Sequence, residues 1–338
     1  MSRTQNEKDK GFIATLITAF GDSDEPPTRV EIEAKAAMLA PILGFDGDLE
    51  HVVAVAETVI PSRMSAGVSL VDPEATHDQE WILKREIQTT YAEAYGDFLR
   101  SEGWKPTVVN TLLNDDGAKI LGLLQDPTDE GAWNRRGLVI GHVQSGKTAN
   151  YLGVVAKAAD AGYKFIIVIA GIHNNLRKQT QRRVDEGFVG RSSDPVNRVP
   201  IGVGLNKDYP NPVTLTNIHA DFNKQTADKS GAKLNDFKKP VIIVIKKNVK
   251  TLEVLHTWLR DLNAKGADRI RDVPMLVIDD EADNASINTN KLDINPTATN
   301  SWIRKILRLF TKSCYVGYPA TPVAHIFIGP DAFDKDAY

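Results

Sequence analysis

Short apolar runs that alternate with helix-compatible stretches dominate the chain from about residue 135, and they constrain the fold more than any other feature. These runs are rich in β-branched residues and lie at Leu138–Ile140, Lys164–Ala170, Val241–Ile245, Met275–Ile278 and Cys314–Val316. Helices are predicted between them, at Ser145–Ala159, Asn174–Glu186, Val249–Leu262 and Ser301–Phe310. The exception is the segment 188–240, which predicts an irregular region with one short strand near Val213–Thr216. Continuous apolar strands separated by helices predict an α/β domain with a doubly wound parallel sheet.

The first 130 residues have a different pattern, which predicts a mainly helical region. Helical patterns occupy Glu31–Ala40, Gln79–Ser101 and Val108–Leu124. The first of these is expected to stop at Pro41, because proline disrupts a helix interior. No catalytic motif occurs in this region. We therefore expect a helical N-terminal region at 1–130 and the α/β domain at 131–338.

The composition excludes several classes of protein. With 42% hydrophobic and 25% charged residues, the chain can bury a core and is not expected to be disordered. The formal net charge is −3, so any surface for nucleic acid must be a local patch. The one cysteine, Cys314, lies in an apolar run, which predicts a core residue in a protein of the reducing cytoplasm. The longest strongly apolar run, Phe165–Ile172, is too short to cross a bilayer, so no membrane association is expected.

One segment matches the phosphate-binding pattern G-x-x-x-x-G-K-[ST]. It consists of Gly141, His142, Val143, Gln144, Ser145, Gly146, Lys147 and Thr148. Its glycines let backbone N–H groups and a helix N-terminus surround a phosphate, while Lys147 reaches the β- and γ-phosphates and the Thr148 hydroxyl ligates Mg²⁺. A glycine turn with a surface lysine is the alternative. An apolar strand before the loop and a helix after it are the context that the chemistry needs, so ATP and Mg²⁺ are the expected cofactors.

A second candidate motif follows a distant strand. Met275–Ile278 runs directly into the carboxylates Asp279, Asp280 and Glu281. In doubly wound sheets ligands gather at the carboxyl ends of strands, so this motif is expected to approach the phosphate loop. Asp280 would hold Mg²⁺ and Glu281 would orient and deprotonate the attacking water, with Lys147 as the third catalytic residue. The alternative is a helix N-cap or a solvated turn.

These motifs together resemble superfamily-two helicases and translocases. Asp280-Glu281-Ala282-Asp283 spells the DEAD form of their motif II, and Gly317–Pro322 is similar to their motif III. Ile169–Arg177 lies where motif Ia is expected, at a strand end that opens a helix. The resemblance implies a RecA-like ATPase lobe. It further implies that Asp283, Ala320 and Thr321 couple the ATP site to strand movement.

A closer resemblance is to bacterial proteins that carry the Z-one domain. Gly141–Thr148 and Val241–Asn248, with the DEAD letters, carry this similarity, which covers about 135–325. It implies an ATPase of restriction-like anti-phage gene clusters, associated with an endonuclease and with MutL- or MORC-type ATPases. Pro319 stands where motif III usually has Ser or Thr, so a hydroxyl link from this position to the acidic motif is not expected. Because the sequence ends at Tyr338, just past motif III, we expect a fragment without the second lobe and its arginine finger, and hence weak hydrolysis.

Nucleic acid is expected to bind around the start of the helix that follows Phe165–Ile172. The candidate contacts are His173, Asn174, Arg177 and Lys178. A helix N-terminus and polar side chains favour strand phosphates, and nearby cations add to the attraction. Lys178 and Arg182 are four residues apart and share a helix face. A solvated helix face with no ligand is the alternative.

Three functions are compatible with these features. The leading hypothesis is the ATP-hydrolysing lobe of a superfamily-two-like DNA translocase or helicase in anti-phage defence. The second is a nucleotide-gated interaction module that switches assembly with a MutL- or MORC-like partner without translocation. The third is another phosphate-loop enzyme such as a small-molecule kinase, against which the DEAD letters and the Ala320-Thr321 pair argue.

Overall fold

The central feature of the fold is one sheet of six parallel strands in the order β1-β6-β5-β2-β4-β3. The computed structural model describes residues 3–21, 27–57, 77–139, 146–224, 233–264, 268–282 and 298–319. The strands are β1 (Trp133–Leu138), β2 (Phe165–Ala170), β3 (Val213–Thr214), β4 (Val241–Lys246), β5 (Met275–Asp280) and β6 (Lys312–Tyr318). Every pairing between them is parallel, so all six strands end at the same edge of the sheet.

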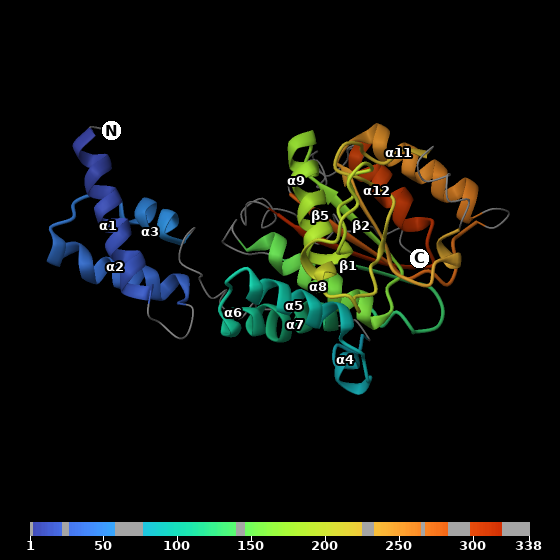
Figure 1. Ribbon diagram of the computed structural model, residues 1–338, viewed down its shortest axis with the longest axis horizontal. Coiled ribbons are helices and arrows are strands. Elements are labelled where there is room, and N and C mark those ends of the chain that lie inside the picture. Colours follow the sequence, from blue (N-terminus) through green and yellow to red (C-terminus); the bar gives the residue numbers. More distant parts are fainter. Residues whose placement is uncertain are drawn as a thin grey trace, which may run out of the picture.

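Helices cover both faces of this sheet (Figure 1). One face carries α8 (Lys147–Ala161) and α9 (Asn174–Val184), and the other carries α11 (Val249–Trp258) and α12 (Ala298–Arg308). In β2, Ile166 and Val168 pack into the first layer, whereas Ile167 and Ile169 pack into the second. The alternation follows from the two-residue repeat of a strand, and burial on both sides explains why the strand is apolar throughout. The predicted α/β fold with a parallel sheet is confirmed, and it is compatible with a Rossmann-like or RecA-like architecture.

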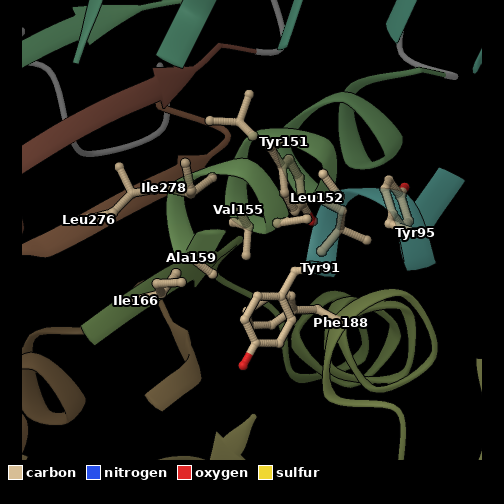
Figure 2. Packing of buried hydrophobic residues seen from close by; sticks show 14 of the residues in the cluster. Tyr91, Tyr95, Tyr151, Leu152, Val155, Ala159, Ile166, Phe188, Leu276 and Ile278 are labelled. Carbon is tan, nitrogen blue, oxygen red and sulfur yellow. The ribbon is translucent and has the colours of Figure 1, made fainter. Parts of the chain in front are cut away.

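A third set of helices packs against α8 on the side away from the sheet. α5 (Thr90–Ser101) and α7 (Gly117–Leu123) contact α8 directly, whereas α4 (Trp81–Lys84) packs on α7 and α6 (Pro106–Asn110) packs on α5. Figure 2 shows side chains of α8 between strand residues and an aromatic group: Tyr151, Leu152, Val155 and Ala159, then Ile166, Leu276 and Ile278, and finally Tyr91, Tyr95 and Phe188. A Cβ on Gly153 of α8 would lie 2.9 Å from Leu112 Cδ2 and 3.0 Å from Leu113 Cδ2, so an alanine here would require these leucine side chains to shift. Residues 81–124 therefore share the core of the sheet, although the sequence predicted a boundary near residue 130.

The first three helices pack around a core of their own. They are α1 (Arg3–Gly21), α2 (Arg29–Leu43) and α3 (Leu49–Glu57). A capping box between Thr28 and Glu31 starts α2, and Gly44 in the left-handed conformation ends it. The predicted stop at Pro41 is wrong, because α2 continues to Leu43. Among the described residues, no helix is both long and apolar enough to span a membrane.

Several predicted boundaries shift in the structure. The strand expected at Leu138–Ile140 is β1, which begins earlier at Trp133 and ends at Leu138. Among the described strands β1 pairs only with β6, so its polar residues Arg135 and Arg136 are tolerated at the sheet edge. These arginines weaken the apolar pattern by which the sequence would reveal the strand. The expected short strand near residue 213 is present as β3. Short helical turns extend or join the elements at Thr111–Asp116, Asp185–Val189, Gly202–Leu205, Leu234–Asp236 and Leu259–Asn263.

Candidate functional site

The carboxyl edge of the sheet brings the two candidate motifs to one place. In the strand register Leu138 lies opposite Gly317, and Gly317 lies opposite Asp279. The end of β1 is therefore level with the acidic end of β5, with β6 between them. Lys147, the first residue of α8, donates a hydrogen bond from Nζ to the carbonyl oxygen of Pro319, directly after β6.

The contact between α8 and the acidic motif is direct. The Tyr151 hydroxyl, one turn beyond Lys147, lies 3.5 Å from Asp280 Oδ2 although the two residues are 129 positions apart. Lys147 is also near enough to lower the pKa of Asp280, against the effect of burial. Of the phosphate loop, Gly141–Ser145 lies outside the described residues, whereas Gly146, Lys147 and Thr148 form the start of α8. The prediction that the two motifs approach each other is thus met by the residues that the structure describes.

Crowded carboxylates give this edge its electrostatic character. Asp280 is partly buried, and its pKa is raised to about 6, first by burial and then by the charges of Glu281 and Asp279. Lys147 and Lys247 oppose this shift in pKa without cancelling it. An excess of negative charge in a partly buried position favours the binding of a cation.

The oxygen donors at this edge fit Mg²⁺. The Thr148 hydroxyl and the Asp280 carboxylate belong to the hard ligands that Mg²⁺ prefers. The described residues include no cluster of three or more His, Cys, Asp or Glu side chains suited to a metal. Mg²⁺ commonly uses only one or two protein ligands and takes the rest from water and phosphate, so two such residues suffice.

Glu281 adopts an unusual backbone conformation. Its φ angle is 66°, in the left-handed region that non-glycine residues rarely enter. Its N–H donates to the carbonyl oxygen of Tyr318 at 3.0 Å, as does the N–H of Ala282 at 3.2 Å. The Glu281 carboxylate rests against Gly171 at the end of β2, where any Cβ would collide with Oε2. Strain of this kind, held by neighbouring strands, is found most often at functional sites.

A buried ion pair that the sequence analysis missed holds the acidic motif in place. Lys247 Nζ lies 2.5 Å from Asp279 Oδ1, and both side chains are fully buried. The Tyr315 hydroxyl donates to Asp279 Oδ2 at 2.7 Å, and Lys247 Nζ also donates to the carbonyl oxygen of Glu281. Asp279, to which the sequence analysis gave no role, is therefore engaged in a buried ion pair. A single lysine after a strand carries no local signal of such a role.

The motif III-like segment is linked to the acidic motif through the main chain. Tyr318 supplies the carbonyl oxygen that Glu281 and Ala282 share, and Pro319 supplies the one that Lys147 contacts. Both contacts use backbone carbonyl oxygens as acceptors, and proline has this group too. A proline at position 319 therefore does not prevent the segment from contacting Lys147. The proposed coupling residues Asp283, Ala320 and Thr321 lie outside the described residues.

The candidate nucleic-acid contacts separate into two groups. His173, Asn174 and Lys178 are exposed, and Asn174 Oδ1 accepts a hydrogen bond from Lys246 Nζ at 3.0 Å. Arg177 is only 2% exposed, and its guanidinium donates to the carbonyl oxygens of residues 217 and 218. Its position does not support the predicted contact with nucleic acid. The reason is helical periodicity, because Arg177 lies on the inward stripe of α9 with Thr180, Gln181 and Val184.

A further contact joins α9 to the phosphate-loop helix. Arg183, exposed in the last turn of α9, donates from its guanidinium to Thr148 Oγ1 at 2.8 Å. The sequence showed a basic cluster here but gave no reason to connect it with Thr148.

Comparison with known proteins adds no identification. No protein-family model matches this chain. No curated protein matches it either. The functional assignment therefore depends on the residues gathered at the carboxyl edge of the sheet.

Proposed function

We propose that this chain binds ATP with Mg²⁺ and hydrolyses it, as one lobe of a superfamily-two-like DNA translocase or helicase in a restriction-like anti-phage system. The observation that carries the proposal is the meeting of Lys147 with Asp280 and Glu281 at one sheet edge. Phosphoryl transfer needs a cation that binds phosphate, a ligand for the metal and a base for the attacking water. The parallel strands bring residues of these three types from distant parts of the chain to one edge of the sheet.

Each side chain has a distinct role in this proposal. Lys147 would exchange the Pro319 carbonyl for oxygens of the β- and γ-phosphates. Thr148 and Asp280 would hold Mg²⁺, which offsets the negative charge of the phosphates. Glu281 would orient a water molecule and accept its proton, and its carboxylate is held beside Gly171 at the same edge.

Two observations support a nucleic-acid strand as the partner. His173, Asn174 and Lys178 are exposed near the start of α9, and Lys246 lies against Asn174. Cations and amide groups of this kind bind phosphates without reading sequence. The family resemblance alone supplies the remaining parts of the proposal, which are DNA as the nucleic acid, the anti-phage system, and an endonuclease or MutL- or MORC-like partner.

Nucleotide titration with matched variants tests the proposal. We expect a fluorescent ATP analogue with Mg²⁺ to bind the wild-type chain and to bind Lys147→Ala at least about tenfold more weakly, because a charge-assisted contact is lost. Lys164→Ala, an exposed lysine before β2 at the opposite edge, is the control and should bind normally. Absence of binding by the wild type, or equal binding by Lys147→Ala, contradicts the proposal.

Turnover tests the role of the acidic motif separately. Glu281→Gln should keep nucleotide binding and lose roughly 10²–10⁴-fold in single-turnover hydrolysis, the usual contribution of a general base. Unchanged hydrolysis would remove Glu281 from this role. Stimulation by duplex DNA that weakens steeply with salt is expected of the motor, since phosphate contacts release counterions. No stimulation at any salt would favour the nucleotide-gated interaction module instead.

A further inference from the structure

Arg183 is the side chain at the candidate site that neither motif accounts for. It belongs to the last turn of α9, and its exposed guanidinium reaches the Thr148 hydroxyl in the first turn of α8. Its neighbour Arg182 is also exposed, but consecutive helical residues point about 100° apart. Among the described residues, the hydrogen bond to Thr148 is recorded for Arg183 and not for Arg182.

Two residues of α8, Thr148 and Tyr151, link Arg183 to the acidic motif. Tyr151 connects the two, because its hydroxyl lies 3.5 Å from Asp280 Oδ2 and also contacts Thr148. Arg183 is therefore linked to Asp280 through Thr148 and Tyr151, while Lys147 is close enough to Asp280 to lower its pKa. On the proposed function, the Asp280 side is where the metal and the terminal phosphate would be bound.

A metal ion and the Arg183 guanidinium at the same Thr148 hydroxyl would repel each other. Both are positively charged, and the same hydroxyl oxygen serves each of them. If Thr148 held Mg²⁺, this repulsion would favour the transfer of the Arg183 guanidinium to another acceptor. One such acceptor is Glu186, whose pKa is raised by burial and lowered by the charges of both Arg182 and Arg183. A terminal phosphate carries more negative charge than one carboxylate, and two of its oxygens can accept hydrogen bonds from the planar guanidinium fork.

We propose that Arg183 is a specificity-determining residue that contacts the γ-phosphate and selects nucleoside triphosphates over diphosphates. This inference rests on the proposed function. Before nucleotide binds, Thr148 holds the guanidinium beside the site; after binding, the γ-phosphate replaces the hydroxyl as acceptor. A diphosphate lacks that group, so it gains nothing from Arg183.

Binding of a slowly hydrolysed ATP analogue and of ADP, both with Mg²⁺, tests this directly. Arg183→Ala should weaken the ATP analogue about tenfold or more and ADP less than about twofold, because only the triphosphate loses a charge-assisted pair. Arg183→Lys should recover part of the affinity for the triphosphate, since it keeps the charge without the fork geometry. Arg182→Ala is the matched control and should change neither affinity.

The outcomes separate this inference from the proposed function. Equal losses for both nucleotides in Arg183→Ala, or no loss for either, would overturn the role of Arg183 while leaving wild-type ATP binding intact. A wild-type chain that binds neither nucleotide would overturn the proposed function and this inference together. Thermal unfolding of Arg183→Ala should match that of Arg182→Ala, which shows that any change in selectivity does not come from loss of fold.

Discussion

Asp280→Asn should stabilise the fold, and the gain should be larger at pH 8 than at pH 5. The partly buried Asp280 has a pKa raised to about 6 from its ordinary 3.8, chiefly by burial and then by Glu281 and Asp279. Between about pH 4 and about pH 6 the folded chain keeps on Asp280 a proton that the unfolded chain has released. The contribution of this group to stability is therefore greatest below about pH 4 and decreases as the pH rises to about 6.

The magnitude follows from the size of the pKa shift. A rise of about two units corresponds to about 3 kcal/mol at pH 8, where the carboxylate is ionised in both states. At pH 5 the unfolded carboxyl is mostly ionised and the folded one mostly protonated, so roughly half of this penalty applies. Asparagine removes the buried charge, while its Oδ1 can still accept the Tyr151 hydroxyl.

Urea unfolding at the two pH values measures the effect. Asp280→Asn should exceed the wild type by up to about 3 kcal/mol at pH 8 and by about 1.5 kcal/mol at pH 5. Asp115→Asn, an exposed control, should change stability by less than about 0.5 kcal/mol at both. A destabilised Asp280→Asn at pH 8, or a gain independent of pH, would refute the reasoning and show that Lys147 and Lys247 outweigh burial.

Two further substitutions test the structures that hold the acidic motif. Lys247→Met should cost about 3–5 kcal/mol in denaturant unfolding because it leaves the buried Asp279 charge without its lysine; a loss under about 1 kcal/mol would contradict the buried pair. Gly171→Ala should lower ATP turnover with little change in stability, because its Cβ displaces the flexible ends of Glu281 and Leu176; Gly137→Ala, with open space around it, is the control. Normal turnover in Gly171→Ala would show that the position of Glu281 against β2 is unimportant.

Local patterns in the sequence predicted the elements that depend on local physics. The apolar runs that form β2, β4 and β5 are buried on both faces of the sheet. Consecutive apolar residues therefore mark these strands in the sequence. The strand that precedes the phosphate loop was less accurately placed. β1 lies at an edge, where Arg135 and Arg136 are tolerated and the apolar signal is short.

Other features depend on how distant segments meet, and only the tertiary structure decided them. The burial of Arg177 depends on the rotation of α9 about its axis, which packing against the sheet sets. The pairing of Lys247 with Asp279 depends on β4 and β5 each lying beside β2, and the contact of Arg183 with Thr148 depends on two helices packed side by side. Residue types and strand periodicity are local properties of the chain, whereas register and helix rotation minimise the energy of the whole core. For that reason the sequence could predict that Lys147 and Asp280 lie close together. The positions of Lys247 and Arg183 beside them could be found only from the tertiary structure.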